Sequence, residues 1–270
     1  MPTRRVFLAA PLTLAAQGIL DVPPPRPGTR IEYGADTNQF GELRVPSGSG
    51  AHPVAIVIHG GYWRARYDLA HIGHLCEALT KQGVATWSLE YRRIGNPGGG
   101  WPGTLDDVRA GAAHLRKIAA ERSLDLKRVA ATGHSAGGHL VLWLARQNAI
   151  PLRAVVPLAP VADLRRAWEL KLSSNVVAEF LGGSPSEVPD RYATTSPVEM
   201  VPLGVPQRVL HGANDDVVPI DISRRFVAAA KKSGDDSKLI EVASAGHFEL
   251  IDPRSSAWPM VRSAVLELVK

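Results

Sequence analysis

The sequence has few of the features that would tie it to a membrane, a nucleic acid or a disulfide framework. Its 270 residues include a single cysteine, Cys76, so no disulfide can form within the chain. The net charge is only +5 and the basic residues form no long run, which argues against nucleic-acid binding. The apolar run near the N-terminus, residues 6–16, is too short to span a bilayer as a helix. What remains is an ordinary globular composition, of a length that suits one α/β domain.

The first twenty residues differ from the rest of the chain. Arg4 and Arg5 precede the apolar run and small residues follow it, which is the layout of an export signal. The stretch TRRVFL also resembles a bacterial twin-arginine signal, which carries folded proteins. We therefore predict that residues 1–20 are a signal peptide cleaved between 16 and 20, and that the protein is periplasmic or secreted without stable membrane association. The alternative is an attached apolar helix on a cytoplasmic protein.

Residues 21–29 contain four prolines, which favour an extended chain and oppose a helix. This composition predicts a linker, followed by a folded domain over residues 30–270. Cys76 lies in an apolar helical pattern, which indicates a buried structural thiol rather than a reactive one.

Short apolar runs alternate with helical patterns along the predicted domain. The runs read as strands over residues 53–60, 84–92, 128–135, 153–160, 206–212 and 238–244. Unbroken apolar strands between helices predict an α/β fold: a mostly parallel, doubly wound sheet with helices on both faces. Residues 30–45 are expected to add one or two antiparallel edge strands. Residues 162–203 interrupt the alternation and are expected to form a small lid over the carboxyl edge of the sheet, where ligands bind.

The segment Gly133–Gly137 has the pattern G-x-S-x-G between an expected strand and an expected helix. In that setting the glycines let two backbones pass closely, and the serine stands exposed on a tight turn at the sheet edge. Ser135 is therefore the candidate nucleophile, and the N–H of Ala136 opens the helix that would face a reacting oxygen.

A serine hydroxyl needs a base, a group that orients the base, and donors for the oxyanion. In this kind of fold, an acid and then a histidine follow later strands in that chain order. His247 lies after the last expected strand, and Asp215 or Asp216 lies after the strand before it. Asp163, after another strand, is the runner-up acid.

The motifs HGGYW, GHSAGG, HGANDDVVP and AGHFEL resemble the α/β-hydrolase superfamily, in particular its esterase/lipase and kynurenine-formamidase-like branch with an H-G-G-x-W motif. The similarity covers residues 30–270, and it implies that Asp215 is the acid. It also implies an oxyanion hole from the glycine turn, with Gly60, Gly61 and Tyr62 acting together with Ala136. Trp63 and His134 would line the substrate pocket, although Trp63 could equally be a packing residue.

The remaining polar candidates have ordinary explanations. His71 and His74 lie three apart on a helix face, but no further ligand stands at a supporting spacing, so no metal site is expected. His211 closes a strand and reads as a turn residue. Glu199 in the lid reads as an exposed charge that could contact substrate.

Together these residues predict a serine hydrolase that cleaves a carboxylic ester of a small or aryl substrate through an acyl-enzyme, without a cofactor or metal. Its expected partner is a small acyl substrate, and the sequence leaves the oligomeric state open. Two alternatives remain: an amidase, aryl formamidase or peptidase on the same triad, and a non-catalytic binding protein with a hydrolase fold.

Overall fold

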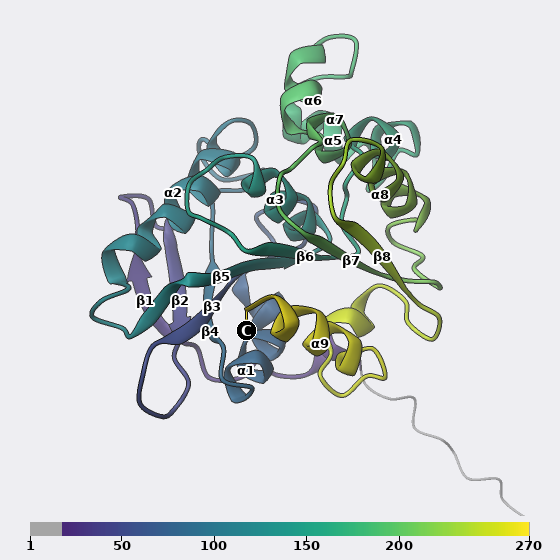
Figure 1. Cartoon of the computed structure of the whole chain (residues 1–270). Coiled ribbons are helices and arrows are strands. Elements are labelled where there is room, and N and C mark those ends of the chain that lie inside the picture. The colour runs from purple at the N-terminus through teal and green to yellow at the C-terminus, as the bar shows by residue number, and fades with distance from the viewer. Residues whose placement is uncertain (1–17, 270) are drawn as a thin grey trace, which may run out of the picture.

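The computed structural model describes residues 18–269 (Figure 1). The segment expected to be a signal peptide lies outside the described residues up to position 17. No helix in the described part is long and apolar enough to cross a membrane.

The fold is built on one eight-stranded sheet. Its strands are β1 (Thr29–Glu32), β2 (Phe40–Arg44), β3 (His52–Ile58), β4 (Ala85–Leu89), β5 (Leu124–His134), β6 (Ala154–Leu158), β7 (Gln207–Gly212) and β8 (Ser237–Val242). They lie in the order β1-β2-β4-β3-β5-β6-β7-β8. The pairs β1–β2 and β2–β4 are antiparallel and every other pair is parallel. The predicted parallel sheet with two antiparallel edge strands is confirmed.

Helices cover both faces of this sheet (Figure 1). They are α1 (Gly73–Lys81), α2 (Gly103–Ile118), α3 (Ala136–Ala145), α4 (Leu164–Glu169), α5 (Val176–Leu181), α6 (Pro189–Thr195), α7 (Pro197–Met200), α8 (Asp221–Lys232) and α9 (Trp258–Val269). Three short 3-10 helices join them: η1 (Ile19–Asp21), η2 (Leu69–Ile72) and η3 (Phe248–Ile251). Helices α1 and α9 lie on one face, and α2, α3 and α8 lie on the other.

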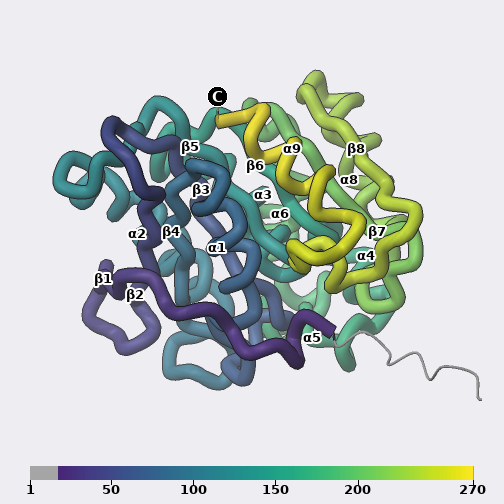
Figure 2. The backbone as a smooth tube through the Cα atoms, turned by 90° about the horizontal axis from the view of Figure 1, so that it is seen from below, coloured from purple at the N-terminus to yellow at the C-terminus, as the bar shows by residue number. Residues whose placement is uncertain are grey.

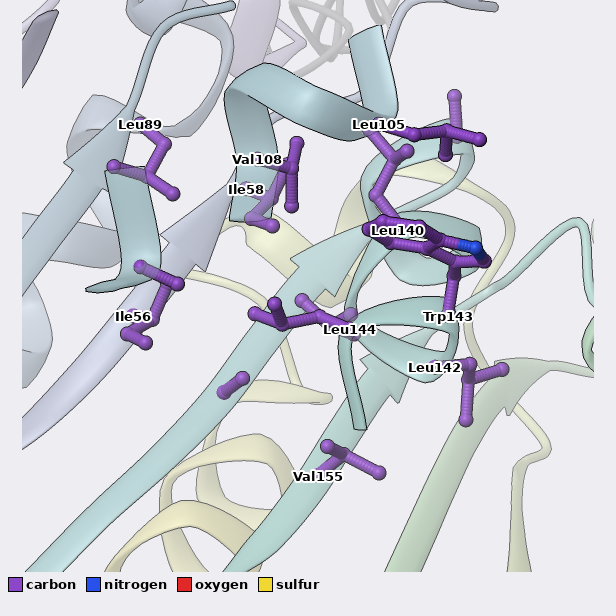
Figure 3. Close-up of a cluster of buried hydrophobic side chains, with 14 of the residues drawn as sticks. Ile56, Ile58, Leu89, Leu105, Val108, Leu140, Leu142, Trp143, Leu144 and Val155 are labelled. Carbon is purple, nitrogen blue, oxygen red and sulfur yellow. The ribbon is translucent and has the colours of Figure 1, made fainter. Parts of the chain in front are cut away.

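The sheet separates two hydrophobic cores because alternate residues of a strand point to opposite faces. In β3, Ile56 and Ile58 pack with Leu140 and Leu144 of α3 (Figure 3), whereas Val57 packs in the other core. Strands buried on both faces therefore read as unbroken apolar runs, which is the pattern that predicted them.

The expected lid exists as the four helices α4 to α7, which lie between β6 and β7. They gather at one end of the molecule, on the side of the sheet that carries α3 and α8 (Figure 1), and α7 contacts both of these helices.

Residues 21–29, the predicted linker, lie against the folded domain. In Figure 2 this segment runs across the body of the protein beside α1. Ile19, just before it, is buried in the core with η3. The backbone N–H of Gly28 donates to Glu42 at 3.1 Å, and a side chain at Gly73 would touch Pro25 at 3.3 Å. The prolines do prevent a helix, but the extended chain they favour is docked on the domain.

Candidate active site

Ser135 lies on a strained turn between the end of β5 and the start of α3. Its backbone has φ 57° and ψ −116°, a region that residues with a side chain rarely adopt. A Cβ on Gly133 would lie 2.5 Å from the carbonyl oxygen of Gly137, and a Cβ on Gly137 would lie 2.1 Å from that of Ile58. Both glycines of the motif are therefore required by close backbone contacts, as the pattern predicts.

The structure brings Asp215 and His247 together from the loops after β7 and β8. Asp215 Oδ2 lies 2.7 Å from His247 Nδ1, and the two side chains are 0% and 3% exposed. The other carboxylate oxygen of Asp215 accepts hydrogen bonds from the backbone N–H groups of Val217 and Val218, at 2.9 and 2.8 Å. This arrangement fixes the carboxylate and leaves Nε2 of His247 as the ring nitrogen for proton transfer.

His211 is a second partner of Asp215 that the sequence did not reveal. Its Nε2 lies 3.3 Å from Asp215 Oδ2 and also 2.8 Å from the carbonyl oxygen of Val218, while Nδ1 contacts the hydroxyl of Ser223 at 2.7 Å. His211 lies near the end of β7, and its ring is buried with both nitrogens hydrogen-bonded. Its spacing of four residues before Asp215 was the available signal.

Burial raises the pKa of the Asp215 carboxyl, but this effect is outweighed. Hydrogen bonds from His211 and His247, the electrostatic effect of the His247 ring and the N–H of Val218 together hold the pKa of Asp215 well below its usual value. Asp215 is therefore ionised at neutral pH, as a group that orients an imidazole must be.

The turn after β3 carries the predicted oxyanion residues. Gly61, Tyr62 and Trp63 all have positive φ, at 103°, 52° and 55°. A Cβ on Gly60 would lie 3.1 Å from the Cβ of Ser135, so this turn lies directly against the nucleophile. Among the described residues, no hydrogen bond uses the backbone N–H of Gly61 or Tyr62. The N–H of Ala136 opens α3 and has no partner within the helix.

Two further contacts tie this turn to its surroundings. The hydroxyl of Tyr62 donates to the carbonyl oxygen of Val217 at 3.0 Å, which links it to the loop of Asp215. Burial and the nearby Asp215 carboxylate raise the pKa of Tyr62 to about 12, so the hydroxyl stays protonated. Trp63 stacks on Phe180 of lid helix α5, with ring centroids 4.6 Å apart.

Trp63 and His134 do not line an open pocket, contrary to the tentative prediction. Both residues are 0% exposed. Nδ1 of His134 lies 2.8 Å from Nε2 of His71, and Nε2 of His134 lies 2.9 Å from the backbone carbonyl oxygen of His247. Because a carbonyl only accepts, His134 donates from Nε2 and accepts from His71. Trp63 packs the lid, and His134 supports the backbone of His247.

Burial is the main cause that lowers the pKa of both supporting histidines, to about 3 for His71 and well below the usual value for His134. Both rings are therefore neutral at ordinary pH, which agrees with the direction of their hydrogen bonds.

The remaining candidates have structural roles. Asp163 caps α4 by accepting from the N–H of Arg166 at 2.9 Å and also pairs with Arg225, so it is not the acid. Glu199 pairs with Arg165 on the lid at 2.9 Å. Burial raises the pKa of the Cys76 thiol to about 11, as expected for a structural cysteine.

No group of three or more potential ligands stands ready to hold a metal ion in residues 18–269. His71 turns to His134, whereas His74 lies 3.5 Å from the carbonyl oxygen of Val22. The two histidines three apart in the sequence therefore have different partners.

The sheet order, the strained serine turn and the paired Asp215 and His247 define an α/β hydrolase. More narrowly, residues 43–229 match the family model BD-FAE, which covers more than half of the chain, and the chain belongs to that family.

Two curated relatives and one solved structure illustrate the similarity. The chain is 27% identical over 198 residues to the probable carboxylic ester hydrolase LipM of Mycobacterium tuberculosis, covering 66% of this chain and 45% of the relative. It is 27% identical over 245 residues to esterase LipC of the same organism, and the match covers 83% of this chain and 60% of that relative. The solved structure of a truncated carbohydrate esterase from gut microbiota shares the fold, with a TM-score of 0.77 and 22% identity. The match covers 94% of this chain and 99% of that structure. The chain thus spans about half the length of the curated relatives it matches.

Proposed function

We propose that the protein is a serine esterase that hydrolyses a carboxylic ester of a small or aryl substrate through an acyl-enzyme. The observation that carries this proposal is the 2.7 Å contact between Asp215 and His247. The backbone carbonyl of His247 lies 2.9 Å from His134, which directly precedes the serine on the strained strand-to-helix turn. The names of the curated relatives, an esterase and a probable carboxylic ester hydrolase, support the same class of reaction.

In this mechanism His247 Nε2 accepts the proton of the Ser135 hydroxyl as its oxygen attacks the ester carbonyl. Asp215 holds Nδ1 and stabilises the imidazolium that forms. The N–H groups of Gly61, Tyr62 and Ala136 stabilise the negative charge on the carbonyl oxygen. His247 then protonates the departing alcohol, and later takes a proton from the water that releases the acid from Ser135.

The surroundings of Ser135 favour a small acyl group. The residue is only 2% exposed, and the oxyanion turn beside it packs against lid helix α5 through Trp63 and Phe180. A long acyl chain would have to displace these packed side chains, which costs more than an acetyl or propionyl group requires.

The test is hydrolysis of p-nitrophenyl acetate, butyrate and octanoate, a feruloyl ester, N-formylkynurenine and an aminoacyl anilide, with wild type and Ser135→Ala side by side. Serine-dependent turnover of the esters, falling with chain length, is expected. Preference for the formamide or anilide would replace the esterase by the amidase alternative. Turnover that survives in Ser135→Ala would overturn the mechanism.

We also infer that the protein is exported by the twin-arginine route, as Arg4, Arg5 and the following apolar run indicate. The buried side chain of Ile19 favours cleavage before Ile19, because a cut after this residue would remove part of the core. Intact mass of the periplasmic protein tests this, and a full-length cytoplasmic chain would refute it.

A further inference from the structure

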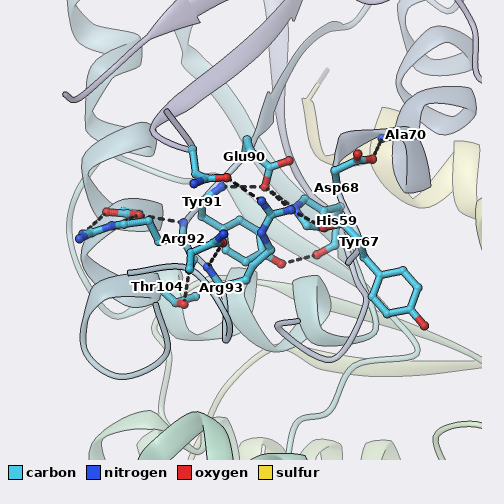
Figure 4. A network of polar contacts seen from close by, with 12 residues as sticks. His59, Tyr67, Asp68, Ala70, Glu90, Tyr91, Arg92, Arg93 and Thr104 are labelled. Carbon is cyan, nitrogen blue, oxygen red and sulfur yellow. Dashed lines mark hydrogen bonds and ion pairs between the residues drawn. The ribbon is translucent and has the colours of Figure 1, made fainter. Parts of the chain in front are cut away.

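His59, the first residue of the HGGYW motif, directly precedes the oxyanion turn and lies in a polar network with Glu90 and Arg93 (Figure 4). The ring is 0% exposed and its two nitrogens face two different acceptors. Nδ1 lies 2.8 Å from the backbone carbonyl oxygen of Gly60, and Nε2 lies 3.0 Å from Oε1 of Glu90.

The acceptors determine where the protons of this ring are. A carbonyl oxygen can only accept, so Nδ1 must carry a proton. Glu90 is held as a carboxylate, because its Oε1 also receives the backbone N–H of Tyr91 at 3.0 Å and lies 2.9 Å from the guanidinium of Arg93. A carboxylate also only accepts, so Nε2 carries a proton as well. A ring that donates from both nitrogens is an imidazolium.

Tyr91 and Arg93 surround the His59 ring and its loop and hold them in place. The ring of Tyr91 stacks on His59 with centroids 4.5 Å apart and planes 16° apart, a geometry that suits a cation over an aromatic face. The hydroxyl of Tyr91 donates to the backbone carbonyl of His59 at 2.9 Å. Arg93 also donates to the carbonyl oxygen of Tyr67, further along the same loop. Glu90, Arg93 and the imidazolium together carry one net positive charge in a buried place.

The bond from His59 sets the orientation of the peptide between Gly60 and Gly61. The peptide is trans, because the cis bonds among the described residues both precede proline. In a trans peptide the carbonyl oxygen and the following N–H point in opposite directions. With the Gly60 oxygen turned to His59, the Gly61 N–H points away from His59, in the opposite direction within the peptide plane. This peptide lies against Ser135, since a Cβ on Gly60 would be 3.1 Å from the serine Cβ.

We propose that Glu90 and His59 are positioning residues of the oxyanion hole: the carboxylate keeps His59 as an imidazolium, which fixes the Gly60–Gly61 peptide with its N–H aimed at the substrate oxyanion. The inference rests on the proposed function. The buried positive charge acts together with that N–H, because both favour the negative charge that develops in the transition state.

Protonation is tested directly on the wild-type protein labelled with 15N-histidine. We expect one-bond N–H couplings at both ring nitrogens of His59 at pH 7, assigned through nuclear Overhauser contacts with the stacked Tyr91 ring. A coupling at one nitrogen alone would overturn the proposal. This measurement needs no variant and no substrate, so it stands even if a substitution fails to fold.

The kinetic test compares Glu90→Gln with Glu42→Gln. The first variant removes the charge beside His59 but keeps a side chain of the same size; the second changes a carboxylate on β2 whose partners are Arg44 and the N–H of Gly28. For Glu90→Gln we expect kcat to fall about tenfold with KM within about twofold, a fraction of the loss of a whole oxyanion donor. Glu42→Gln should stay within about twofold in both constants.

An unchanged kcat in Glu90→Gln, while Ser135→Ala is inactive, would overturn this inference and leave the proposed esterase intact. Activity that survives in Ser135→Ala would instead overturn the proposed function itself.

Discussion

Asp215 and Asp216 are neighbours in the chain, but their surroundings differ completely. The Asp215 side chain has no exposed surface and contacts His247 and His211, whereas Asp216 is exposed. Chain order alone left both open as the acid; the H-G-x-x-D-x-x-V-P resemblance selected Asp215, and the contacts agree with it.

The matched pair Asp215→Asn and Asp216→Asn tests this distinction. An amide at position 215 cannot hold His247 in the required tautomer, and we expect kcat to fall by about 10⁴-fold, as for the equivalent change in other serine hydrolases. The kcat of Asp216→Asn is expected to stay within about twofold of the wild-type value. The check is kcat on p-nitrophenyl acetate, with folding monitored by circular dichroism. A comparable loss in both variants would contradict the assignment.

His134 shows what single residues in a sequence do not reveal. Its partners, His71 and the carbonyl of His247, come from positions 63 and 113 residues away in the chain. A contact of that kind depends on the assembled fold, so the motif pattern identified the nucleophile but not the ring that supports the base.

At the scale of elements, the strand, turn and helix around Ser135 are shaped by the geometry that exposes the hydroxyl. The φ of 57° and ψ of −116° at Ser135 are tolerated by glycine at little cost and strain any residue with a Cβ. The fold keeps this strain because α3 and the second half of β5, next to the turn, are buried.

Replacing Ser135 separates strain from chemistry. We expect Ser135→Gly to stabilise the fold by about 1 kcal/mol, by relief of backbone strain, which raises Tm by roughly 2–4 °C at this size. Ser135→Ala keeps the Cβ and should melt close to the wild type. Both variants should be inactive. Differential scanning calorimetry decides the point, and a glycine variant less stable than the alanine variant would show that the turn is not strained.

The same scale shows which elements the sequence could predict. Strands that are buried on both faces appear in the sequence as unbroken apolar runs. The lid appears as an interruption in the alternation of strands and helices. For residues 21–29 the composition predicts the extended conformation, but not whether a neighbouring surface accepts the segment. Docking on α1 and β2 depends on contacts such as Gly28 with Glu42, which no local pattern encodes.

Across the whole molecule, two buried carboxylates make the fold sensitive to acid. Burial raises the pKa of Glu90, but the charge and hydrogen bond of His59, the charge of Arg93 and the N–H of Tyr91 outweigh it, so its pKa is lowered as that of Asp215 is. A carboxyl whose pKa is lower in the folded state stabilises the fold above its unfolded pKa, about 4, and this contribution is lost as the pH falls.

Urea unfolding at pH 6 and pH 3 tests this linkage. We expect the wild type to lose free energy of unfolding between the two values, and Asp215→Asn to lose about 1 kcal/mol less, because an amide does not titrate. Asp216→Asn should lose as much as the wild type. Equal pH dependence in all three proteins would show that Asp215 is not held in the charged form.

The N-terminal segment is the other whole-molecule feature, because it joins the chain before β1 to the core on the α1 and α9 face. Ile19 is 6% exposed and packs in that core, while the adjacent Leu20 is 47% exposed.

Truncating a buried isoleucine removes its contacts and leaves a cavity, so Ile19→Ala should lower the free energy of unfolding by about 2 kcal/mol. Leu20→Ala removes a similar side chain that is largely in water and should change it by no more than about 0.5 kcal/mol. Urea unfolding of the two variants at pH 7 measures the difference, and equal stability would mean that the segment is not docked in solution. If the difference is found, residues 18–28 belong to the folded domain, and its boundary lies before the prolines rather than after them.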